Sequence, residues 1–406
     1  MAGRVRQPIN VGNLERWISK HVPEIELPID VKQFGFGQSN PTYQLTAADG
    51  QRFVLRKKPP GRLVSKTAHK VEREYRIISA LAKTDVPVPR AYCLCEDESV
   101  IGTPFYIMEF LDGRIFEDPV IPNVLPDHRR AIWADAVRTL AKLHRIDPKS
   151  IGLENFGKPT GFYSRQVATW RSICDAQAQV RDIETREPVG QLPFFEEMME
   201  FFADESQQPA DRGTLIHGDF KIDNLVFHKT EPRVIGVLDW EMSTIGHPLS
   251  DLSNLLTPYF TARLDPRRSV NVHPGFLPRA TRGLPTHDEI TALYFSVVDR
   301  PESSSLDLAP RIDDAVRQRE LQWAQAFNIF RLSAICQGIA ARQAGRQASS
   351  EQARRYGDAR TPLAEFAWEL VQETKKTGQV GQKGNSKSEN KGKKQDANGG
   401  SRSSKL

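Results

Sequence analysis

The segment His217-Gly-Asp-Phe-Lys-Ile-Asp-Asn224 decides the fold, together with Asp239, which follows fifteen residues after Asn224 in Val-Leu-Asp-Trp. Residues 225–238 contain two short apolar stretches with a turn between them, a pattern that predicts a β-hairpin. Because a hairpin returns the chain to its starting point, we expect Asp239 to lie close to Asn224. The alternative is that these Asp and Asn residues only form turns around the hairpin.

The spacing inside this segment matches the requirements of phosphoryl transfer. That reaction needs a carboxylate beside the attacking hydroxyl, oxygen ligands for magnesium and positive charge near the phosphoryl group. We expect Asp219 to accept or orient the hydroxyl proton, and Lys221 to neutralise charge on the γ-phosphate. Asn224 and Asp239 are the expected Mg2+ ligands, since this ion prefers few carboxylates plus phosphate oxygens. His217 is placed in the same catalytic loop, where we expect it to brace the backbone.

These motifs resemble those of the aminoglycoside phosphotransferase and choline-kinase-like superfamily, whose members are relatives of protein kinases. The resemblance covers about residues 30–370 and is strongest to the kinase-like domain fused to some peroxisomal acyl-CoA dehydrogenases. It implies an α+β, bilobal protein-kinase-like fold with a small β-rich N-lobe and a larger helical C-lobe. It also implies ATP and Mg2+ as cofactors. No dehydrogenase domain accompanies these motifs, so we expect a stand-alone version of that domain.

Four segments of the expected N-lobe resemble the nucleotide site of that superfamily. Residues 34–40 match a nucleotide-covering loop, 53–57 a phosphate-contacting strand, 72–75 a helix with an ion-pairing Glu, and 105–113 a hinge. The cofactor-binding residues that the resemblance implies are Gly35, Gly37, Ser39, Asn40, Arg56, Lys57, Glu74, Glu109 and Leu111.

Two of these assignments have competing candidates. Alternation along the strand places Arg56 and Lys57 on opposite faces; Arg56 matches the family position, and Lys57 is the second candidate. Glu74 is preferred to Glu72 as the ion-pairing residue because it lies beside the apolar face of its helix. A simple surface charge is the alternative for Glu74.

Three features outside the motifs have two interpretations each. His144, at the end of a predicted helix, is expected to be structural, with a catalytic role as the alternative. Asp251 is expected to brace the catalytic loop, with a helix N-cap as the alternative. The arginine-rich loop 257–287 either shapes an acceptor pocket for a carboxylate or a phosphorylated carrier, or is a solvated loop.

Composition divides the chain into a nearly neutral body and a basic tail. Residues 1–374 carry 47 basic and 49 acidic side chains, whereas 375–406 carry nine basic and two acidic ones. A neutral body argues against a nucleic-acid partner, and no apolar stretch approaches the ~20 residues of a membrane span. The expected parts are an N-terminal helix and connector (1–30), an N-lobe (31–112), a C-lobe (113–374) and a disordered basic tail (375–406).

The chain ends in Ser404-Lys405-Leu406, which matches a peroxisomal address. It predicts the peroxisomal import receptor as a partner and the peroxisome as the location in a eukaryotic source, or the cytoplasm otherwise. A nuclear signal or nucleic-acid arm is the competing interpretation of the Lys-rich tail.

The expected activity is therefore ATP- and Mg2+-dependent phosphorylation of a hydroxyl group on a small molecule. The resemblance suggests a hydroxyacyl or hydroxyacyl-CoA acceptor. Neither Asp-Phe-Gly nor Ala-Pro-Glu occurs in the sequence, so a phosphorylated activation loop is not expected. The alternatives are an aminoglycoside- or choline-type kinase acting on another small alcohol, and a non-catalytic pseudokinase that serves as a binding module.

Overall fold

The computed structural model describes six stretches of the chain: 2–35, 40–59, 70–270, 272–299, 313–347 and 350–392. The chain forms two compact units, each assembled from separate segments. One unit comprises Met1–Phe162, Asp211–Ala262 and His273–Leu306; the other comprises Tyr163–Ala210, Arg263–Val272 and Asp307–Leu406. The lobe boundaries expected at 30, 112 and 374 stay a prediction.

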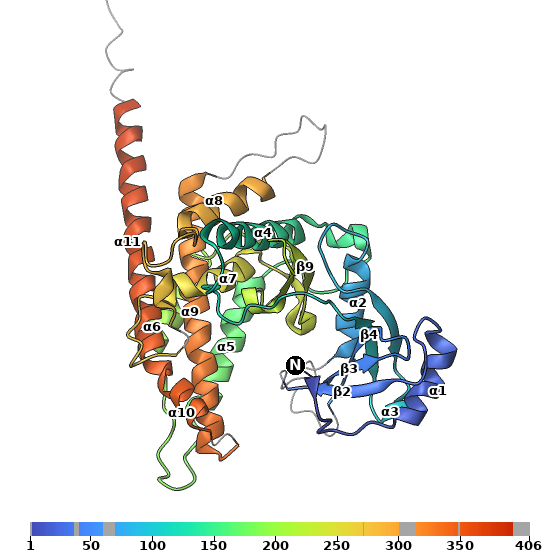
Figure 1. Ribbon diagram of the computed structural model, residues 1–406. Coiled ribbons are helices and arrows are strands. Elements are labelled where there is room, and N and C mark those ends of the chain that lie inside the picture. The colour runs from blue at the N-terminus through green and yellow to red at the C-terminus, as the bar shows by residue number, and fades with distance from the viewer. Residues whose placement is uncertain are drawn as a thin grey trace, which may run out of the picture. The chain divides into compact units, whose positions relative to one another are not determined.

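An antiparallel sheet of six strands, in the order β1-β2-β3-β4-β6-β5, forms the N-terminal part of the first unit (Figure 1). A turn at Asp49-Gly50 joins β3 to β4, and Gly50 adopts a φ of 86°, which favours glycine. The strands are β1 Ala2–Gly3, β2 Asp30–Phe34, β3 Thr42–Thr46, β4 Arg52–Lys57, β5 Ala91–Cys95 and β6 Phe105–Glu109.

Helices cover both faces of this sheet. On one face, α1 (Val11–His21) and α3 (Glu98–Ile101) share an apolar core with Leu55 of β4 and Phe105 of β6. On the other face lies α2 (Val71–Leu81), which contacts β5 and β6. Since successive strand residues point to opposite faces, β4 presents Leu55 to the α1 side and Arg56 to the α2 side.

The remainder of the first unit carries the motif segment. The predicted hairpin is present: β8 pairs with β9 antiparallel, with Leu225 opposite Val237. A second small sheet pairs β7 with β10, and three helices belong to the same unit. The elements are α4 Pro126–Arg145, β7 Thr214–Ile216, β8 Leu225–Phe227, β9 Val234–Val237, β10 Thr244–Gly246, α7 Leu249–Thr261 and α8 His287–Val298.

The second unit is helical and has an aromatic core. Phe202 packs edge-on against Trp323 and Phe327, at ring-centroid distances of 5.3 and 5.1 Å. Its helices are α5 Phe162–Ala178, α6 Phe195–Ala203, α9 Asp314–Ala344, α10 Glu351–Asp358 and α11 Arg360–Gly392.

Helix α11 extends beyond residue 374, where composition predicts disorder. It continues to Gly392, so the structure differs from the expectation over 375–392. Adding residues to an existing helix costs far less than nucleating a new one, which explains how a polar segment continues it. Residues 393–406, and with them Ser404, Lys405 and Leu406, lie outside the described residues. None of the described helices combines the length and the apolar composition that a membrane span needs.

Candidate active site

The catalytic loop begins where β7 ends and is held by a buried carboxylate. The two oxygens of Asp251 accept the backbone N–H groups of His217 and Gly218, at 2.6 and 2.8 Å. Gly218 has a φ of 87°, and a Cβ there would lie 2.5 Å from the Met242 carbonyl oxygen, so only glycine fits. Pro248, not Asp251, is the N-cap of α7; Asp251 therefore braces the loop.

Two further side chains support this carboxylate. His144 Nε2 lies 3.3 Å from Asp251 Oδ2, and His144 Nδ1 lies 2.7 Å from the Tyr294 hydroxyl. All three side chains are buried. Burial alone would raise the pKa of Asp251, but the hydrogen bond and charge of His144 and the N–H group of His217 outweigh it and lower that pKa. Asp251 therefore stays ionised inside the protein.

The predicted catalytic carboxylate, Asp219, receives a hydrogen bond on each oxygen. Asn254 Nδ2 lies 3.2 Å from Oδ1, and Asn224 Nδ2 lies 3.1 Å from Oδ2. Lys221 Nζ lies 3.6 Å from the same Oδ2 and 3.2 Å from Asp223. Burial alone would lower the pKa of Lys221, but the charges of Asp219 and Asp223 raise it, so the ammonium group keeps its proton.

The ring of His217 connects this loop to the hairpin. Its Nε2 lies 2.8 Å from the Leu238 carbonyl oxygen, and its Nδ1 accepts the backbone N–H of Asp219 at 3.2 Å. The ring is fully buried and packs against Trp240. Since both ring nitrogens bind the backbone, the geometry fits a bracing residue.

The hairpin brings the two expected metal ligands together. The Leu238 N–H donates to the Asn224 carbonyl oxygen at 2.9 Å, so Asp239 comes next to Asn224 as predicted. The Asn224 amide nitrogen binds Asp219, which leaves the amide oxygen as its coordinating atom. Asp239 is more than one-third exposed. One amide and one carboxylate oxygen fit Mg2+, with phosphate and water oxygens completing its shell. Among the described residues, no group of three His, Cys, Asp or Glu side chains could hold a metal ion.

Arg56 links β4, α2 and the hairpin. Its guanidinium lies 3.2 Å from Glu74, 2.7 Å from Asp239 and 3.4 Å from Glu241. The expected ion pair between Arg56 and Glu74 is therefore present. Lys57 lies on the opposite face of β4, where its side chain is buried and burial lowers its pKa. Sequence reasoning missed Glu241, although it stands only two residues after Asp239.

Glu74 is the buried centre of this polar cluster. Asn40 Nδ2 donates to Glu74 Oε1 at 2.7 Å, and the Tyr106 hydroxyl donates to Oε2 at 3.0 Å. Burial raises the pKa of Glu74 to about 7, against the opposing charge of Arg56. The Asn40 amide oxygen is buried without a hydrogen-bond partner among the described residues.

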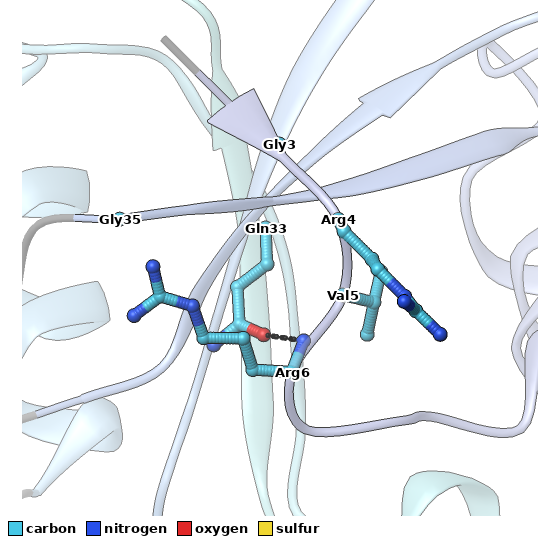
Figure 2. Close-up of a pocket in the computed structure, with 6 residues that line it drawn as sticks. All are labelled: Gly3, Arg4, Val5, Arg6, Gln33 and Gly35. Atoms are coloured by element: carbon cyan, nitrogen blue, oxygen red, sulfur yellow. Dashed lines mark hydrogen bonds between the residues drawn. The ribbon is translucent and has the colours of Figure 1, made fainter.

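The remaining nucleotide-site candidates are distributed over the sheet and the hinge. Gly35 follows β2 and lines a cavity of about 480 Å³ with Arg4 and Arg6, whose guanidinium groups point away from each other in Figure 2. The Glu109 carboxylate accepts the Arg90 N–H at 3.0 Å. Leu111 packs so closely on β9 that a Cβ on Gly236 would lie 2.0 Å from its Cδ1. Gly37 and Ser39 lie outside the described residues.

The arginine-rich loop has carboxylate partners of its own. Arg263 and Arg268 form ion pairs with Glu373 and Glu365 of α11, at 3.4 and 3.2 Å. Arg267 pairs with the neighbouring Asp265. These three cations are therefore engaged within the second unit, which weakens the idea that they bind an acidic acceptor.

Known proteins resemble this chain along most of its length. A sequence profile of the phosphotransferase enzyme family matches residues 30–288. Acyl-CoA dehydrogenase family member 11 from Gallus gallus is 38% identical over 366 residues, which are 88% of this chain and 43% of that protein. The chain thus spans less than half the length of this curated relative.

Solved structures show the same architecture. A crystal structure from Ralstonia eutropha, named as a candidate aminoglycoside phosphotransferase, has 36% identity and a TM-score of 0.73, covering 90% of this chain and 99% of that one. Choline kinase from Cryptosporidium parvum, at 13% identity and a TM-score of 0.55 over 91% and 96% of the two chains, shares the fold. The α+β, bilobal protein-kinase-like fold expected from the sequence is confirmed.

Proposed function

Because this chain belongs to the phosphotransferase enzyme family, we propose that it transfers the γ-phosphoryl group of ATP to a hydroxyl group of a small molecule. The observation that carries the proposal is the arrangement around Asp219. A half-exposed carboxylate has an amide donor on each oxygen and an ammonium group 3.6 Å away. Arg56 forms an ion pair with Asp239, the expected metal ligand.

The proposed transfer takes place at the γ-phosphorus of ATP. The acceptor oxygen forms a bond to the γ-phosphorus, the bond from that phosphorus to the β–γ bridging oxygen breaks, and ADP leaves with the electron pair. Asp219 takes the hydroxyl proton on a carboxylate oxygen. Lys221 neutralises charge on the transferring group, and Arg56 steadies the phosphates, with Glu74 holding its guanidinium. Mg2+ held by Asn224 and Asp239 would neutralise charge on the β- and γ-phosphate oxygens.

We further propose a hydroxyacyl or hydroxyacyl-CoA acceptor. The support is the 38% identity to a protein named as a member of the acyl-CoA dehydrogenase family. Phosphorylation turns a hydroxyl into a better leaving group, which suits a step before an elimination in acyl-chain breakdown. The terminal Ser404-Lys405-Leu406 supports a place for this reaction in the peroxisome, reached through the import receptor.

Mass spectrometry tests the proposal directly. The purified protein is incubated with Mg-ATP and a panel of hydroxy acids, hydroxyacyl-CoAs, choline and an aminoglycoside. We expect a mass gain of about 80 Da on one hydroxyacyl acceptor, the mass of one transferred phosphoryl group. The gain should disappear in Asp219→Asn, which keeps the shape of the side chain but loses the base.

An exposed carboxylate supplies the matched control. Asp127 lies in the first turn of α4 and is exposed, so Asp127→Asn makes the same chemical change away from the site. This control should transfer phosphate as the wild type does. Transfer only to choline or an aminoglycoside would contradict the proposed acceptor, and ATP binding without transfer to any acceptor would indicate a pseudokinase. A protein that binds no ATP would contradict the proposed function itself.

A further inference from the structure

Helix α7 presents two polar side chains to the catalytic loop, one helical turn apart. Asp251 binds two backbone N–H groups of the loop, as described above. Three residues further on, the Asn254 amide nitrogen lies 3.2 Å from Asp219 Oδ1 and 3.2 Å from the Phe220 carbonyl oxygen. Since positions i and i+3 share a face of a helix, a single face of α7 contacts all four residues 217–220.

We infer that Asn254 is a positioning residue that sets the orientation of the catalytic carboxylate of Asp219, an inference that rests on the proposed function. An amide NH2 group has two hydrogens, and both of those on Asn254 have an acceptor in the loop. The two groups next to the other oxygen, Asp219 Oδ2, also interact elsewhere. Asn224 is an expected metal ligand, and Lys221 also pairs with Asp223.

The orientation of a carboxylate needs such an external restraint. The last torsion of an Asp side chain joins an sp3 to an sp2 carbon, and its energy wells are broad. With a donor on Oδ1 and another on Oδ2, the plane of the Asp219 carboxylate is fixed. Loss of Asn254 frees one oxygen, so fewer bound molecules would have the acceptor hydroxyl aligned with the base.

Two variants separate the hydrogen bond from the shape of the side chain. Asn254→Ala removes the amide, and Asn254→Asp keeps its shape but replaces the donor with an oxygen. Asn155→Ala is the matched control, since Asn155 is an exposed asparagine in a turn of the same unit. We would measure kcat and the KM for Mg-ATP with the acceptor that the mass-spectrometry experiment identifies, together with the midpoint of thermal unfolding.

Both Asn254 variants should lower kcat about 10- to 100-fold, the loss expected for one hydrogen bond to a charged group. The KM for Mg-ATP should stay within about twofold, because the nucleotide contacts proposed above come from other residues. The control should match the wild type. A kcat within twofold of wild type in either Asn254 variant would overturn the inference. So would a rise in KM together with a drop in the thermal midpoint, which would indicate general loss of structure.

A second readout does not depend on turnover. In crystals of Asn254→Ala grown with Mg-ADP, the Asp219 carboxylate should rotate away from its wild-type orientation or occupy two. An unmoved carboxylate would contradict the inference even if the wild type transferred no phosphate. If the wild type transferred no phosphate but the Asp219 carboxylate was displaced in Asn254→Ala, the proposed function would be contradicted and the inference about Asn254 would stand.

Discussion

Replacing Asp251 with Asn tests the buried support of the catalytic loop. The carboxylate accepts the N–H groups of His217 and Gly218, at 2.6 and 2.8 Å, and binds His144 at 3.3 Å. An Asn side chain has one acceptor oxygen, so one of the two N–H groups would face an NH2 donor instead. Asp251 is only 1% exposed, so water cannot replace the missing acceptor.

The magnitude follows from the bonds lost. A hydrogen bond to a charged group contributes about 1.5–3 kcal/mol, and a stranded buried N–H group costs about 1–3 kcal/mol. We therefore expect Asp251→Asn to lower the free energy of unfolding by about 3–5 kcal/mol, a large part of a typical domain's stability. Phosphoryl transfer should fall as well, because the loop that carries Asp219 loses its anchor.

Urea unfolding followed by circular dichroism measures this loss, with Asp127→Asn as the control expected to stay within about 0.5 kcal/mol. The pKa of Asp251 is lowered in the folded protein. The contribution of the Asp251 carboxylate to the free energy of unfolding is therefore fully present above its unfolded-state pKa. It disappears as the pH falls through its folded-state pKa. The difference between wild type and Asp251→Asn should shrink in acid. A loss below about 1 kcal/mol at neutral pH, with transfer intact, would refute the reasoning.

Four other variants test three separate parts of the site. Glu74→Gln removes a carboxylate whose pKa is raised to about 7. As the pH rises from about 4.5 to about 7, the unfolding free energy of the wild type should therefore fall by about 3 kcal/mol relative to this variant. Parallel curves of unfolding free energy against pH, measured in urea, would contradict this prediction. Gly218→Ala should lower the unfolding free energy by about 2 kcal/mol or more and abolish transfer, since the new Cβ would meet the Met242 carbonyl oxygen. A stable, active variant would show that the loop accommodates a side chain. Arg56→Met should weaken Mg-ATP binding at least about tenfold in calorimetry. Lys57→Met changes the other face of β4 and should leave this binding unweakened. The reverse ranking of the two variants would exchange the roles of Arg56 and Lys57.

Local patterns predicted the parts of the site that lie close together in the sequence. The hairpin over 225–238 brings Asp239 back to Asn224, because two paired strands can end only beside their start. Strand alternation likewise separates Arg56 from Lys57. In both cases the geometry follows from the period of the strand and needs no knowledge of distant segments.

Contacts between distant segments could not be predicted in this way. Asn254 reaches Asp219 across 35 residues, and Tyr294 reaches His144 across 150. Periodicity indicates which face of a helix is buried but not which partner it meets. The only sequence signal for Asn254 is its spacing of three from Asp251, which places both on one helical face once either is known to contact the loop.

The buried chain from Tyr294 through His144 to Asp251 has a consequence for how this protein can change over evolution. Each member satisfies a polar group of the next, so replacing any single one leaves an unpaired partner out of reach of water. The effects of single substitutions should therefore not add, and a second substitution should cost less once the first has been made. Descendants of this sequence would have to cross a poorly stable intermediate, or exchange these residues together.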